Sequence, residues 1–137
     1  MADPKAAPTT VTVDLGARSY DILIGRNVID TAGAEIARRL PGARVAVVTD
    51  QTVADLHLRA LVASLAAAGI DHVAVTVKPG EASKSFATLE TVVDGILAAR
   101  MERRDVVVAL GGGGGGDPAG FAARITPPGM HFVHVPP

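Results

Sequence analysis

The chain has 137 residues, 48% of them hydrophobic, which is enough for one domain with a sizeable core. Its 13 basic and 14 acidic residues give a formal net charge of -1, which argues against binding to nucleic acid or an anionic membrane. The absence of cysteine excludes disulfides and thiolate metal sites and fits a reducing compartment.

The first ten residues, MADPKAAPTT, are polar and proline-containing, and we expect residues 1–10 to be a disordered tail. They lack the apolar stretch of a signal peptide, and no apolar run of the chain reaches the length of a membrane span. We therefore expect a cytoplasmic protein.

Alternating apolar and polar residues at 11–15 and 20–24 predict a β-hairpin. Residues 28–40 then follow a helical period, with Asn27 as a plausible N-cap. A second helix is predicted over 53–68 from its apolar residues, with Gly69 as its C-cap. The periodic positions are Val53, Leu56, Leu61, Leu65 and Ala68.

The remaining chain alternates strands with helices. Strands are predicted at 44–50, 72–77, 105–110 and 131–135, and helices at 86–101 and from Asp117, where Pro118 fits position N1. Such alternation predicts a parallel sheet with helices on both faces. We expect one Rossmann-like α/β domain over residues 11–137, with the β-hairpin added at its N-terminus.

Six consecutive glycines, residues 111–116, directly follow the strand at 105–110. Backbone without Cβ atoms between a strand and a helix can bring N–H groups and a helix N-terminus close to an anion. The run satisfies the dinucleotide-binding pattern G-x-G-x-x-G at Gly111, Gly113 and Gly116, although any six glycines would. A loop that binds nothing is the alternative.

Three charged residues are further candidates. Asp50 ends the strand at 44–50, where its carboxylate could accept hydrogen bonds from ribose hydroxyls or cap the helix that follows; alone, the cap is favoured. Glu81 and Lys84 could pair across a helical turn or reach a nucleotide, and alone a solvated pair is favoured.

His131 and His134 have the spacing of an HxxH metal motif. Residues three apart on a strand point to opposite faces, so they cannot share a metal there. We expect no metal site and assign no catalytic residue in this chain.

The motifs, in their order, resemble those of the 3-dehydroquinate synthase family and its sugar-phosphate cyclase relatives. They are VTD after a strand, PGE..KS before a helix, LGGG..GD.AGFAA after a strand, and FVHVP. The resemblance covers residues 11–136 and implies an N-terminal NAD-binding domain. Asp50 would hold the adenosine ribose, the glycine run would approach the pyrophosphate, and Asp117 would lie near the nicotinamide ribose. The cofactor-binding residues implied are Asp50, Gly80, Glu81, Lys84, Gly112, Gly113, Gly116 and Asp117.

In that family, 3-deoxy-D-arabino-heptulosonate 7-phosphate becomes 3-dehydroquinate and phosphate in the shikimate pathway, with NAD and a divalent metal, zinc or cobalt. The metal and substrate groups belong to a C-terminal domain. The resemblance therefore implies the N-terminal part of a longer enzyme, inactive alone, that binds its cofactor and a phosphorylated sugar acid and is compatible with a homodimer. The alternatives are the N-terminal domain of a glycerol dehydrogenase-type polyol dehydrogenase and a non-catalytic remnant.

Overall fold

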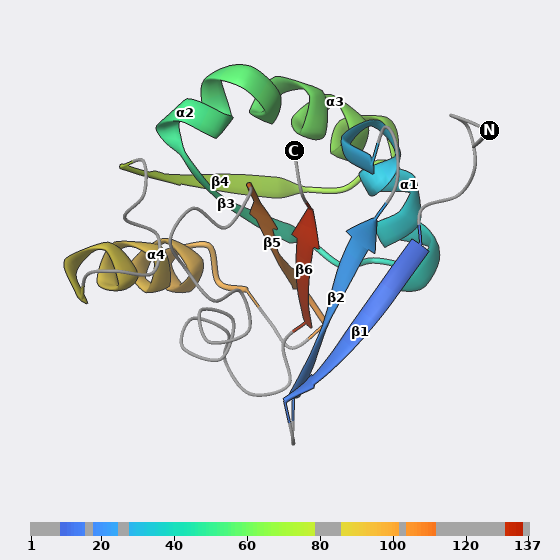
Figure 1. Ribbon diagram of the computed structural model, residues 1–137, viewed down its shortest axis with the longest axis horizontal. Coiled ribbons are helices and arrows are strands. Elements are labelled where there is room, and N and C mark those ends of the chain that lie inside the picture. The colour runs from blue at the N-terminus through green and yellow to red at the C-terminus, as the bar shows by residue number, and fades with distance from the viewer. Residues whose placement is uncertain are drawn as a thin grey trace.

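The computed structural model describes residues 9–15, 18–24, 28–78, 86–101, 104–111 and 131–135 (Figure 1). Its strands are β1 (Thr9–Leu15), β2 (Arg18–Ile24), β3 (Val45–Asp50), β4 (His72–Val77), β5 (Val106–Leu110) and β6 (His131–Val135). Its helices are α1 (Val28–Arg39), α2 (Gln51–Val53), the π-helical turn η1 (Ala54–Leu58), α3 (Arg59–Ala67) and α4 (Phe86–Ala98).

The strands form one six-stranded sheet in the order β1-β2-β6-β5-β3-β4. The hairpin partners β1 and β2 are antiparallel, whereas β2–β6, β6–β5, β5–β3 and β3–β4 are parallel. The predicted hairpin is thus confirmed, and it extends the parallel sheet beside β6. The expectation of a disordered tail over residues 1–10 was wrong at Thr9 and Thr10, because these residues pair with Ile24 and Leu23 of β2. The predicted Rossmann-like α/β fold is confirmed as well.

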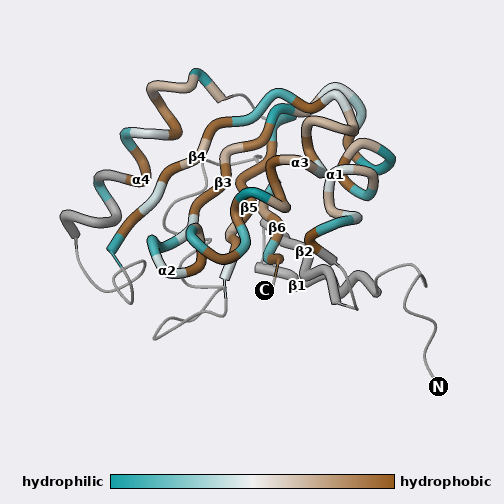
Figure 2. Tube along the Cα trace, turned by 90° about the horizontal axis from the view of Figure 1, so that it is seen from above, coloured by the Kyte–Doolittle hydropathy of each residue, from teal (hydrophilic) through white to brown (hydrophobic). Residues whose placement is uncertain are grey.

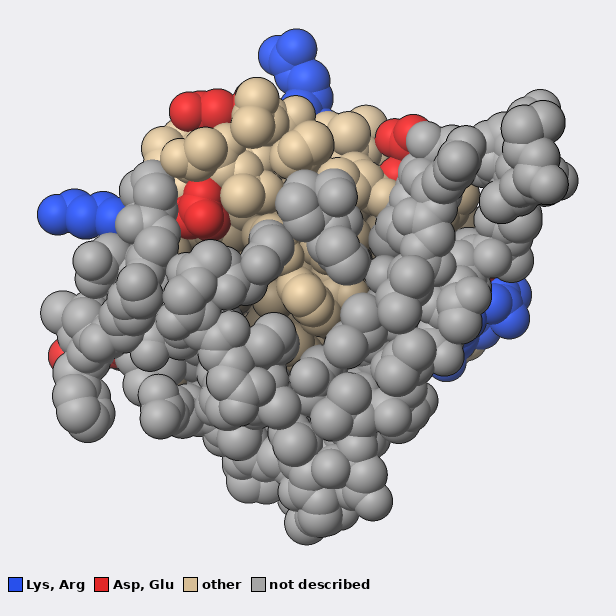
Figure 3. All heavy atoms as spheres, in the orientation of Figure 1, with Lys and Arg blue, Asp and Glu red and all other residues tan. Residues whose placement is uncertain are grey.

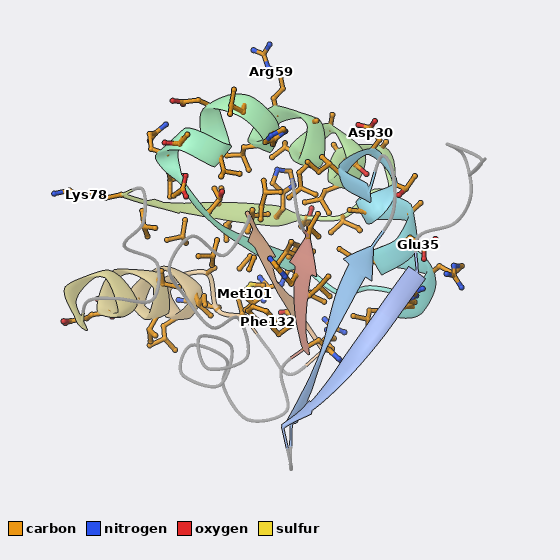
Figure 4. All side chains as sticks on the ribbon, in the orientation of Figure 1. Asp30, Glu35, Arg59, Lys78, Met101 and Phe132 are labelled. Carbon is orange, nitrogen blue, oxygen red and sulfur yellow. The ribbon has the colours of Figure 1, made fainter. Side chains whose placement is uncertain are left out.

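Helices cover both faces of the sheet, as predicted: α1 and α3 lie on one face and α4 on the other (Figure 1). Figure 2 shows β3, β5 and β6 as largely hydrophobic segments between these layers. On the α4 side, Met101 and Phe132 lie close together in the core, whereas Arg59 points from α3 away from the sheet (Figure 4). The predicted strands at 44–50 and 105–110 are accordingly buried on both faces.

Helices α1 and α3 approach each other closely at Gly33. A Cβ built there would lie 2.1 Å from the carbonyl oxygen of Ser64, so only glycine allows this approach. The Gly33 N–H donates to Oγ of Ser64 at 2.9 Å, and that hydroxyl donates to the carbonyl of Asp30 at 2.9 Å. The contact fixes the helical layer against which the core strands pack.

The helix predicted over 53–68 begins earlier and is irregular. It starts at Gln51, because Asp50 caps it, and η1 interrupts it before α3. A π turn inserts one residue into the helical period, so Leu56, expected on the apolar face, is 71% exposed while Leu61 is buried. The predicted period was wrong at this turn.

The predicted end of this helix at Gly69 is confirmed. Gly69 has φ +73°, its N–H donates to Ala66 at 3.0 Å, and the N–H of Ile70 donates to Leu65 at 3.0 Å. These two bonds form a Schellman motif, for which glycine is the preferred residue. The predicted Asn27 cap and the helix from Asp117 lie outside the described residues.

Within the described residues, no helix has the length and apolar character that a membrane span requires.

Candidate functional site

The chain changes direction within the sheet between β3 and β5. After β3 it moves outward to β4, and it then returns to β5 on the other side of β3. Parallel α/β sheets bind ligands at such a switch point, beyond the carboxyl ends of the strands. We call this end, where β3, β5 and β6 finish, the carboxyl end of the sheet.

Asp50 and Gly111 meet at this switch point. Strands β3 and β5 are paired with Val48 opposite Ala109, which brings Asp50 and Gly111 to neighbouring strand ends. Asp50 also lies opposite Val77, the last residue of β4. The ends of β3, β4 and β5 therefore lie side by side at the carboxyl end of the sheet.

Asp50 is the N-cap of α2. Its backbone is extended, with φ -96° and ψ 167°, and its Oδ1 accepts the N–H of Val53 at 2.8 Å. The capping interpretation is therefore confirmed. The cap uses one of the two carboxylate oxygens of a half-buried side chain, and the ribose contact stays a prediction.

Gly111, the first glycine of the run, adopts a conformation that selects glycine. Its φ is +148°, which side chains with a Cβ rarely adopt. Space is not the constraint, since a Cβ there would lie 3.7 Å from Cγ2 of Val53, an ordinary contact. The backbone itself requires glycine at the point where the run leaves β5.

Side chains of the two flanking strands contact the end of β5. Thr49 on β3, which is 3% exposed, donates from Oγ1 to the carbonyl of Leu110 at 2.9 Å. His134 on β6 lies with Nε2 2.7 Å from the carbonyl oxygen of Gly111. A carbonyl can only accept, so this nitrogen carries the proton. The N–H of Gly111 donates to the carbonyl of Val135 at 3.1 Å.

The roles of Thr49 and His134 were not predicted from the sequence. The available signal was a polar residue within an otherwise buried strand, close to its carboxyl end. The predicted opposite facing of the two histidines agrees with the packing. Phe132 belongs to the α4-side core and Val133 to the other, so alternation places His134 on the α4 side and His131 on the α1 side.

The other predicted site residues, Gly80, Glu81, Lys84, Gly112, Gly113, Gly116 and Asp117, lie outside the described residues. Their roles stay predictions. Lys78, just before them, is exposed and projects beyond the carboxyl end of β4 (Figure 4).

On the face shown in Figure 3, the acidic and basic side chains of the described residues are scattered among uncharged ones and form no single charged patch. Among the described residues, no three His, Asp or Glu side chains are grouped as metal ligands. The switch point thus combines the carboxylate of Asp50 with the backbone of Gly111, which carries no side chain. Both features suit a nucleotide.

A second polar cluster lies at the opposite, amino end of the sheet. The buried carboxylate of Asp105 accepts the backbone N–H of Arg44 at 2.8 Å and pairs with its guanidinium at 3.0 Å. The same guanidinium donates to the carbonyls of Ala99, at 3.1 Å, and Arg100, just after α4. This cluster joins β3, β5 and the end of α4, and it was not predicted from the sequence.

Comparison with known protein families gives a match in the carboxyl-terminal part of the chain. Residues 74–137 match the family described as 3-dehydroquinate synthase N-terminal. This segment is therefore similar to the N-terminal domain of that family. Over nearly its whole length the chain is similar to curated 3-dehydroquinate synthases. It is 60% identical to that of Brucella ovis over 131 residues and 61% identical to that of Brucella anthropi over 128 residues.

The chain is shorter than these relatives. The match covers 96% of this chain but 35% of the Brucella ovis protein, and 93% and 34% for Brucella anthropi. The chain thus spans about a third of the length of the curated relatives it matches.

Solved structures agree on the fold. A 2-deoxy-scyllo-inosose synthase matches with TM-score 0.70 and 24% identity over 93% of this chain and 36% of its own. The 2-epi-5-epi-valiolone synthase of Streptomyces hygroscopicus, solved with NAD⁺ and Zn²⁺ bound, matches with TM-score 0.67 and 29% identity over 90% of this chain and 34% of its own. An NADH-dependent butanol dehydrogenase of Thermotoga maritima matches less of this chain, 68%, and 22% of its own, with TM-score 0.53 and 25% identity.

Proposed function

We propose that this chain is the NAD-binding N-terminal domain of a 3-dehydroquinate synthase. The observation that carries the proposal is 60% identity to proteins of that name over 96% of the chain. The whole enzyme would convert 3-deoxy-D-arabino-heptulosonate 7-phosphate to 3-dehydroquinate and phosphate. The dehydrogenase alternative has weaker support, because the butanol dehydrogenase matches less of the chain at a lower TM-score than the valiolone synthase.

The described residues fit a dinucleotide. Asp50 offers a half-buried carboxylate that accepts hydrogen bonds, as ribose hydroxyls require, and Gly111 on the adjacent strand begins a backbone without Cβ atoms, which suits a pyrophosphate. The proposed cofactor set is Asp50 with Gly80, Glu81, Lys84, Gly112, Gly113, Gly116 and Asp117.

Bound NAD would supply reversible hydride transfer at the substrate. The role of this chain is to bind and orient the dinucleotide beside the remaining part of the enzyme. No metal is assigned to the described residues, and the divalent metal, zinc or cobalt, belongs in this proposal to the rest of the enzyme. A cytoplasmic location, which the sequence led us to expect, and a homodimer, with which the resemblance is compatible, complete the proposal.

Calorimetric titration of the chain with NAD⁺ tests the cofactor assignment, with NADP⁺ as the matched ligand. We expect saturable binding of NAD⁺ and weaker binding of NADP⁺, because the Asp50 carboxylate would repel a 2′-phosphate. Absence of NAD⁺ binding to the folded chain would contradict the proposal.

A second assay separates cofactor binding from catalysis. The chain alone, given NAD⁺, zinc and the seven-carbon substrate, should release no phosphate above a buffer blank. Positioning of cofactor, substrate and metal together is worth about 7–11 kcal/mol, and this term is lost without the substrate-binding groups. Phosphate release by chain free of host enzyme would show that catalytic groups lie within these 137 residues.

A further inference from the structure

The last residues of β5 are held from both sides by side chains of the neighbouring strands. Thr49 reaches the carbonyl of Leu110 from β3, and His134 reaches the carbonyl of Gly111 from β6. Both contacts lie at normal hydrogen-bond distances, 2.9 Å and 2.7 Å, and involve consecutive carbonyl groups. Regular strand pairing does not supply either bond, since each donor is a side chain.

The two side chains also approach from opposite faces of the sheet. Thr49 lies on the face of Val45 and Val47, which pack with α1 and α3, and alternation places His134 on the α4 face. With its N–H bonded to Val135, Gly111 has both backbone polar groups fixed by β6. A glycine has many accessible conformations, so external hydrogen bonds are needed to select one.

We propose that Thr49 and His134 are positioning residues that clamp the end of β5 and so hold Gly111, the first glycine of the run, in the backbone conformation that suits binding of the nucleotide phosphates. This inference rests on the proposed NAD binding. Neither side chain is assigned a contact with the cofactor. Each acts through a carbonyl of the strand that leads into the run, and each contributes before any ligand arrives.

Pairs of substitutions test the clamp in the full 137-residue chain. H134Q keeps an N–H donor, whereas H134L removes it at similar size; T49S keeps the hydroxyl, whereas T49V removes it without changing shape. H131L is the control, because His131 lies on the same strand but is exposed and faces the other side. Calorimetry measures NAD⁺ affinity, urea unfolding measures stability, and NMR measures hydrogen exchange of the Gly111 amide without ligand.

We expect H134L and T49V each to weaken NAD⁺ binding by about tenfold, the equivalent of one lost hydrogen bond of about 1.4 kcal/mol. H134Q, T49S and H131L should stay within about threefold of the parent chain. Exchange of the Gly111 amide should be faster in H134L and restored in H134Q.

Two results would overturn the clamp: NAD⁺ affinity unchanged in H134L and T49V, or failure of H134Q and T49S to restore it. If the parent chain binds NAD⁺ and the variants bind equally well, only the clamp is wrong. If the folded parent chain does not bind NAD⁺, the proposed function is wrong, and the proposed clamp, which depends on it, is wrong as well.

Discussion

The two ends of the parallel sheet are held together by different chemistry. At the amino end, the fully buried carboxylate of Asp105 is paired with Arg44, whose guanidinium also binds the carbonyls that follow α4. At the carboxyl end, Thr49, Asp50 and His134 form hydrogen bonds to backbone groups. The first end concentrates charge in the core, and the second places polar groups at a switch point.

This difference implies that the amino end of the sheet mainly stabilises the fold, whereas the carboxyl end mainly serves ligand binding. Removing one member of an ion pair that includes a buried charge is destabilising, so substitutions at the amino end should lower stability most. Single hydrogen bonds contribute about 0.5–1.5 kcal/mol each, so changes at the carboxyl end should affect stability less. Ligands of such folds bind at the carboxyl end, where small shifts of the backbone should weaken binding.

The largest effect on stability is expected for R44M. The substitution removes the cation beside the buried Asp105 carboxylate and should lower the free energy of unfolding by about 3 kcal/mol. Urea denaturation measures the change. NAD⁺ affinity of the folded fraction should remain that of the parent chain.

Arg38 provides the matched control, because it forms an exposed pair with Glu35 at 2.6 Å on α1. R38M should change stability by about 0–1 kcal/mol. Equal losses in R44M and R38M would show that the amino end is not held by its buried charge.

A smaller effect is expected for G111A. The added Cβ has room, but φ of +148° is unfavourable for alanine and should lower stability by about 1–3 kcal/mol. If the backbone relaxes instead, the clamp is disturbed, and NAD⁺ binding should weaken in either case.

Gly69 is a control with the same kind of constraint at the other end of the sheet. It has φ +73° and nothing within 4 Å of a built Cβ, so G69A should lower stability by about 1–2 kcal/mol. NAD⁺ affinity should be unchanged. Equal NAD⁺ binding by G111A and G69A would contradict the assignment of the carboxyl end to the nucleotide.

The sequence predicted most of the fold because its signals are local. Runs of apolar residues marked β3 and β5, and a glycine marked the end of α3. The sequence also placed Asp50 and the glycine run at the ends of two strands of one parallel sheet, and the register of β3 with β5 brings Asp50 beside Gly111. The π turn was missed, because a helical period assumes regular spacing through Leu56.

The bonds at both ends of the sheet could not be predicted. Arg44 and Asp105 are separated by 61 positions, as are Thr49 and Leu110. Their contacts depend on β3 lying beside β5, and the contact of His134 depends on β6 lying on the other side of β5. Lateral strand order is set by the packing of the whole sheet, which no local pattern encodes.

The smallest effect on stability separates the two roles given to Asp50. D50A removes the cap of α2 and should lower stability by about 1 kcal/mol, while D50S retains an oxygen that can cap and should lower it by only a few tenths, roughly 0.3 kcal/mol. Serine lacks the second carboxylate oxygen, so a ribose contact would be lost in both variants. We expect calorimetry to show NAD⁺ binding at least about tenfold weaker in D50S as well as D50A, because hydrogen bonds to charged groups are worth about 1.5–3 kcal/mol. If D50S binds NAD⁺ as the parent chain does, Asp50 is a helix cap alone, and the contribution of the carboxyl end to binding lies in its backbone.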